Sequence, residues 1–89
     1  MVQQNYPNPF NPETVIKYGI PNNEKVEVVI CNVLGQKVKT LVSKNQEAGF
    51  YEVKWDATND YGNNVGSGIY FYRVKAGKHV AIKKMVLLR

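Results

Sequence analysis

The chain has 89 residues, with 12 Lys and Arg against 7 Asp and Glu, which gives a formal net charge of +5. This length suits one small domain with a single modest core and excludes an enzyme that carries a separate cofactor domain. With 44% hydrophobic and 11% aromatic residues, the composition is that of a folded domain rather than a disordered tail. No stretch is long and apolar enough for a membrane span, and residues 1–5 lack the pattern of a secretory signal peptide.

Turn residues divide the chain into about seven short apolar runs, at the spacing typical of a β-sandwich. The first run, residues 14–20, follows a proline-rich segment at 6–12 whose prolines favour an extended or turning backbone. The second run begins after a polar break at 21–24. Alternating apolar residues predict the inward faces of these two strands, namely Ile16, Tyr18 and Ile20 in the first and Val26, Val28 and Ile30 in the second.

A tight turn at residues 34–36, in which Gly35 supplies a positive φ, connects the second strand to a third at 37–42. We expect residues 43–49 to form a polar connection to the next strand. In that strand Tyr51, Val53 and Trp55 share one face, and Trp55 is the largest core candidate.

A loop rich in Asp, Asn and Gly at 56–68 precedes a strand at 69–76 that is apolar on both faces, which predicts a central position in a sheet. After a turn at Gly77, the last strand, residues 80–89, is expected at or near an edge. No helical period and no alternation of strands with helices interrupts the series. The sequence therefore predicts an all-β, immunoglobulin-like antiparallel sandwich of about seven strands.

Few residues could support catalysis. His79, the single histidine, lies beside a turn and has no acidic neighbour in sequence to orient its ring. Cys31, the single cysteine, can form no internal disulfide and lies in a β-forming run without an adjacent base, so we interpret it as half-buried packing. We predict that the chain is not an enzyme and holds no cofactor.

The loop at 56–64 gathers carboxylate and amide oxygens around Gly62, the ligand type that Ca²⁺ prefers. It lacks the bidentate Glu and the spacing of a calcium loop. We therefore assign no metal ligands and predict that Asp and Asn cap their own backbone, with Gly62 in a left-handed conformation.

The lysines are dispersed among apolar neighbours, as on solvated strand faces, so we predict no nucleic-acid binding. Tyr70 and Tyr72 share one face of their strand with Val74, and we interpret this face as core. An aromatic platform for carbohydrate remains the alternative interpretation of these rings.

Several segments, in order, resemble the C-terminal sorting domain of cargo proteins of the type IX secretion system. The resemblance runs from about residue 5 to residue 89. Its segments are 5–12 (NYPNPFNP), 32–38 (NVLGQKV), 48–51 (AGFY) with 55–56 (WD), 67–73 (SGIYFYR) and 84–89 (KMVLLR). The hairpin at 32–38 and the strand at 67–72 (SGIYFY) also resemble the Ig-like domain of flagellar hook-assembly proteins.

The resemblance implies a non-catalytic sorting signal at the C-terminus of a larger secreted protein of a Gram-negative bacterium. It implies that an upstream cargo domain crosses the periplasm and that an outer-membrane translocon recognises the sorting domain. It also implies that a sortase removes the domain at the cell surface. The expected location is therefore secreted or cell-surface.

The same resemblance assigns translocon recognition to the end of the chain, while Val86 and Leu88 also suit the last core strand. We expect residues 5–89 to form the sorting domain and residues 1–4 to be a linker. Two alternatives remain: a structural Ig-like spacer or hook-assembly-like module, and an accessory carbohydrate-binding module. The predicted partner-binding residues are Lys84, Met85, Val86, Leu88 and Arg89.

Overall fold

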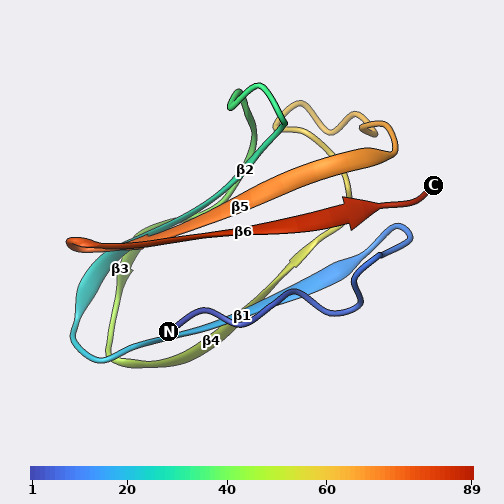
Figure 1. The fold of residues 1–89 in the computed structure, drawn as a ribbon. Coiled ribbons are helices and arrows are strands. Elements are labelled where there is room, and N and C mark those ends of the chain that lie inside the picture. Colours follow the sequence, from blue (N-terminus) through green and yellow to red (C-terminus); the bar gives the residue numbers. More distant parts are fainter.

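The computed structural model describes residues 1–89 and contains six β-strands. The strands are β1 (Thr14–Ile20), β2 (Glu24–Cys31), β3 (Lys37–Gln46), β4 (Gly49–Trp55), β5 (Gly68–Ala76) and β6 (His79–Leu87). They form two antiparallel sheets, one with the order β1-β4 and one with the order β3-β2-β5-β6, which face each other as two layers (Figure 1). The predicted immunoglobulin-like sandwich is confirmed, with six strands. The structure has no helix that could cross a membrane.

The first twelve residues, called here the N-terminal segment (residues 1–12), run along the side of the sandwich between β1 and β6 (Figure 1). Isolated bridges join Val2 to Tyr18 and Tyr6 to Val15. Residues 1–4, which we expected to be a linker, are thus hydrogen-bonded to β1; the Gly19 amide, for example, donates to a carbonyl of this stretch at 2.7 Å. The segment therefore lies beside β1 as an irregular, hydrogen-bonded stretch and not as a further strand.

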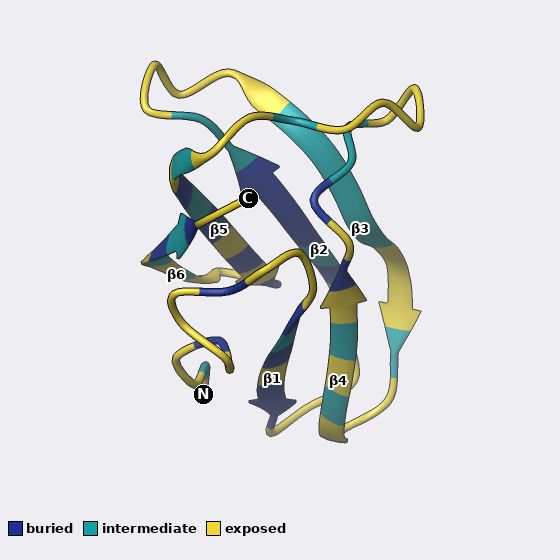
Figure 2. Ribbon diagram, turned by 90° about the vertical axis from the view of Figure 1, so that its right-hand side faces the viewer, coloured by how far each residue is buried: buried dark blue, intermediate teal, exposed yellow.

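The core lies between the sheets and is centred on Trp55, which is fully buried. Its ring centroid is 5.7 Å from that of Phe10 and 5.3 Å from that of Tyr70, so aromatic rings from the N-terminal segment and both sheets meet there. In Figure 2 the colours alternate along β5, where buried residues take turns with more exposed ones. Tyr70 and Tyr72 are buried, which confirms the interpretation of their face as core. The predicted inward residues of the first two strands are all buried, namely Ile16, Tyr18, Ile20, Val26, Val28 and Ile30.

The connection predicted at residues 43–49 is wrong in extent, because β3 continues to Gln46 and only Glu47 and Ala48 separate it from β4. The polar residues 43–46 pair with the start of β2. They lie in an edge strand, where outward polar side chains remain in water and alternation carries no apolar signal. The predicted turn at Gly35 is confirmed, with φ 79°.

Candidate recognition surface at the C-terminal strand

The predicted recognition residues lie at the end of β6, which forms an edge of the four-stranded sheet, as predicted. Their side chains do not share one face. Met85 is fully buried, whereas Lys84 is exposed, Val86 is half-buried and Leu88 is 53% exposed. A partner of the folded domain can touch Lys84 and Leu88 directly, but Met85 only shapes the surface from inside the core.

The N-terminal segment covers the outer edge of this part of β6. The side-chain amide of Gln4 donates to the carbonyl oxygen of Lys84 at 2.8 Å. The amide of Val86 donates to the Asn8 side-chain oxygen at 3.0 Å, and its carbonyl accepts from the amide of Phe10 at 3.0 Å. The Leu88 amide in turn donates to the Phe10 carbonyl at 2.9 Å. Gln4, Asn8 and Phe10 therefore belong to the site. The sequence singled out segment 5–12 as part of the family resemblance but assigned it no role in recognition.

On the side of the site away from the N-terminal segment, Arg89 hydrogen-bonds to the loop at 56–68. Its amide donates to the Ser67 hydroxyl at 2.9 Å, and its guanidinium donates to the carbonyl of Ala57 at 2.7 Å and to that of Val65. Ala57 is fully buried and has a positive φ of 64°, which is unusual for a residue with a Cβ. The last residue of the chain thus supports a loop conformation that the loop alone does not favour.

Within this loop the oxygen side chains accept hydrogen bonds from the chain itself, which confirms the predicted capping. Asp56 accepts from the Thr58 amide at 3.2 Å and from its hydroxyl at 2.6 Å. Asn59 accepts from the amides of Tyr61 and Asn63, and Gly62 has the predicted positive φ of 83°. The Thr58 hydroxyl is the main cause that lowers the pKa of the Asp56 carboxyl below 3.8.

The N-terminal segment is itself fixed at Asn5, a buried polar residue. Its side-chain amide donates to the Thr14 hydroxyl at 2.9 Å and to the Pro7 carbonyl at 3.1 Å, and the Thr14 hydroxyl donates to the same carbonyl at 2.8 Å. No buried side-chain nitrogen or oxygen lacks a partner in the structure. The N-terminal segment, which covers part of β6, is therefore a specific part of the fold.

The two residues examined as catalytic candidates lie apart. His79 is exposed at the start of β6, whereas Cys31 is a half-buried free thiol at the end of β2, as interpreted from the sequence. No three His, Cys, Asp or Glu residues gather in one place. The site is a surface built from backbone edges and a few side chains.

Two antiparallel sheets of this order, with the last strand at an edge, define an immunoglobulin-like domain. The family model of the FlgD Ig-like domain matches residues 14–79, and the chain belongs to this family.

Two solved structures from Porphyromonas gingivalis are similar over nearly the whole chain. One is PorZ, an essential bacterial surface component of the type-IX secretion system, with 28% identity and a TM-score of 0.69 over 99% of this chain. The other is dimeric latent PorU, with 26% identity and a TM-score of 0.72 over 98% of this chain. The chain spans 11% of the PorZ chain and 9% of the PorU chain. No curated protein matches the sequence.

Proposed function

We propose that this domain is a non-catalytic C-terminal sorting signal of the type IX secretion system, which directs a larger cargo protein to the cell surface. The observation that carries the proposal is the likeness to PorZ, which covers 99% of this chain at 28% identity. The sequence motifs described above support the same function. The proposed partners are an outer-membrane translocon, a sortase and an upstream cargo domain, and the proposed location is secreted or cell-surface.

In this proposal the translocon binds the folded end of β6 and not a flexible tail. Met85 and Leu87 anchor the strand in the core, which places Lys84 and Leu88 at fixed positions on the surface. Val86 adds a half-buried apolar contact between them. Arg89, through its bonds to Ala57 and Val65, joins the loop to the same surface. Lys84, Val86, Leu88 and Arg89 are therefore the proposed contacts.

The test is a fusion in which a signal peptide and a reporter enzyme precede residues 5–89 in a cell that has type IX secretion. We expect the reporter at the cell surface. A matched pair of double variants separates recognition from stability. Lys84→Glu with Leu88→Ser alters the proposed contacts. Lys17→Glu with Phe50→Ser makes the same charge reversal and also replaces a large apolar side chain by Ser, at exposed positions of the smaller sheet. Thermal unfolding followed by circular dichroism checks that both variants fold.

Export that is lost with the first pair and kept with the second supports a sorting signal. A reporter that stays in the periplasm with a folded domain rejects it. If the variant Lys84→Glu with Leu88→Ser is exported normally, recognition does not depend on the end of β6. That result would favour the role of an Ig-like spacer for this end of the chain. For carbohydrate binding, Trp55, Tyr70 and Tyr72 offer no exposed platform, because all three are buried.

A further inference from the structure

One stretch of β6 keeps an open edge. Among the six strands, β6 pairs with β5 alone, and its other edge meets only the N-terminal segment near Leu87. Along an antiparallel strand the outward backbone groups belong to every second residue. The bonds from the N-terminal segment engage Lys84, Val86 and Leu88, so the same outer edge carries the N–H and C=O groups of Val80 and Ile82. No hydrogen bond from another part of the chain reaches these groups. We call residues 80–83 the open edge.

The open edge faces an apolar hollow in the side of the sandwich. Here the N-terminal segment pairs with β1, as the bridge from Val2 to Tyr18 shows, and makes no backbone hydrogen bond to residues 80–83 of β6. The hollow has a volume of about 90 Å³, enough for one small aliphatic side chain. Its apolar lining includes Val2, Ile20, Val74, Ala76 and Ala81. A strand added to the open edge would direct every second side chain inward, and this hollow can receive one of them.

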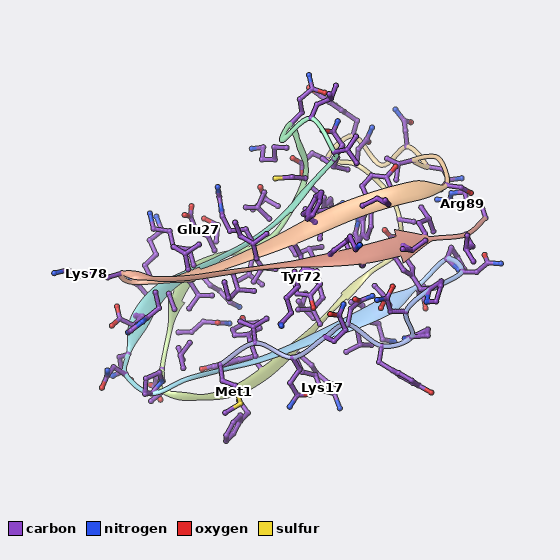
Figure 3. The ribbon with its side chains drawn as sticks, in the orientation of Figure 1. Met1, Lys17, Glu27, Tyr72, Lys78 and Arg89 are labelled. Carbon is purple, nitrogen blue, oxygen red and sulfur yellow. The ribbon has the colours of Figure 1, made fainter.

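The outer face beside the open edge is both apolar and cationic. Ile82 and Val80 are 62% and 53% exposed, and they pair with Arg73 and Lys75 of β5. In Figure 3 Glu27 points outward from this sheet, away from the smaller one. Among the outward-facing residues of β3, β2, β5 and β6, Glu27 is the one acidic residue. The basic residues on the same face are Lys25, Lys37, Arg73, Lys75 and Lys84. An extended partner with acidic residues complements this charge.

We propose that the open edge binds an extended acidic segment of a partner protein as an added β-strand. The partner's backbone hydrogen-bonds to Val80 and Ile82, an inward apolar side chain fills the hollow, and outward carboxylates meet Arg73 and Lys84. The assignment of the translocon as this partner rests on the proposed function; the binding itself does not. The interaction extends recognition from the covered end of β6 to its first half.

The test uses two synthetic peptides with free strand edges, one alternating Glu and Val and one alternating Lys and Val, titrated into the isotope-labelled full chain. We expect the acidic peptide to shift the NMR signals of residues 79–84 and to slow amide exchange at Val80 and Ile82 by about tenfold or more. The basic peptide should leave both unchanged. No protection at these two amides with millimolar acidic peptide overturns the proposal.

Two variants of one residue form the matched control. Ile82→Pro removes an outward N–H that has no partner in the chain, so the edge strand should fold but lose the added strand. Ile82→Thr removes a similar amount of apolar surface and keeps the N–H. We expect Ile82→Pro to abolish peptide binding and Ile82→Thr to weaken it by less than about fivefold. Equal binding by both variants would contradict strand addition.

A second design avoids proline. The double variant Arg73→Glu with Lys84→Glu should bind the basic peptide and no longer bind the acidic peptide. If this variant still prefers the acidic peptide, Arg73 and Lys84 do not select an acidic partner. Sedimentation of the chain alone tests a different occupant: a dimer that Ile82→Pro dissociates would assign the edge to a second copy and overturn our proposal.

The reporter fusion separates this inference from the proposed function. Normal export of the Ile82→Pro fusion rejects translocon binding at the open edge and leaves the sorting function intact. Failure of the unmodified fusion rejects the sorting function, while amide protection by the acidic peptide still decides whether the edge binds a strand.

Discussion

The hydroxyl oxygen of Tyr72 lies 2.9 Å from the backbone nitrogen of Asn5 and accepts its hydrogen bond. The same hydroxyl donates to the carbonyl of Gln3 at 2.7 Å. Tyr72 belongs to the centre of the larger sheet, and Figure 3 shows its side chain between that sheet and the N-terminal segment. One buried phenol therefore links the segment that covers β6 to the core of the opposite layer.

Replacement of Tyr72 by Phe should destabilise the domain by about 1–3 kcal/mol. The buried backbone N–H of Asn5 would lose its acceptor, and water cannot easily take the place of the hydroxyl. Urea unfolding measures this loss. Tyr51→Phe is the control, since the Tyr51 hydroxyl donates to the Glu47 carbonyl at an exposed position, and its cost should be below about 1 kcal/mol. Equal losses in the two variants would show that the Tyr72 bonds do not hold the segment.

The domain should lose stability in alkaline solution. Burial is the main cause that raises the pKa of both Tyr18 and Tyr72 above 10.0, partly offset by a hydrogen bond with Gln46 for Tyr18 and with Asn5 for Tyr72. A group whose folded pKa is raised contributes its full stability below its unfolded pKa and loses it as pH rises through the folded value. Unfolding free energy should therefore fall above about pH 10.

The variants Tyr18→Phe and Tyr72→Phe should each flatten this alkaline decline, measured by urea unfolding across the pH range. Tyr61→Phe removes a hydroxyl from a ring that is 88% exposed and provides the control. A decline equally steep in all three variants and in the unmodified chain would assign it to other groups.

Much of the fold follows from the sequence because its strands alternate cleanly. In β1 from Ile16 and in β2 from Val26 every second residue is apolar and enters the core, and the turn at Gly35 needs a positive φ. The position of the N-terminal segment beside β1 and β6 was not predictable. The segment binds β1 and β6 through backbone groups and through Asn5 and Asn8, and such bonds leave no apolar period.

The sequence places the candidate site at the last strand, and that placement stays a prediction, but it does not reveal which other segments surround the site. The motif at 84–89 directs attention to the last strand, yet a motif does not show which backbone edges another segment covers. Only the structure shows that the Phe10 amide donates to the Val86 carbonyl and that the Arg89 guanidinium donates to the Ala57 carbonyl. Only the structure shows, too, that the uncovered edge lies earlier in β6. These relations join residues far apart in the chain, which local patterns do not encode.

Arg89 should control the order of the loop at 56–68. In Arg89→Ala the carbonyls of Ala57 and Val65 lose a charged donor, and we expect a destabilisation of about 1 kcal/mol, with faster amide exchange confined to residues 57–66. Lys78→Ala, at an exposed turn between β5 and β6, is the control and should change stability by less than about 0.5 kcal/mol. Unchanged exchange in the loop of Arg89→Ala would show that the loop holds its conformation alone.

The hydroxyl of Thr58 should set the acid behaviour of this loop. It is the main cause that lowers the pKa of Asp56. Burial is the next largest effect and raises this pKa, while backbone amides and the charge of Lys39 lower it to a smaller extent. A carboxyl with a lowered folded pKa contributes stability above its unfolded pKa and loses it as pH falls through the folded value. Thr58→Val keeps the shape of the side chain but removes the hydroxyl, so the pKa of Asp56 should rise toward 3.8. Carbon-13 NMR titration of the Asp56 carboxyl measures the shift in its pKa. Thr40→Val in β3 serves as the control. An unchanged pKa of Asp56 in Thr58→Val would assign the low pKa to the backbone amides.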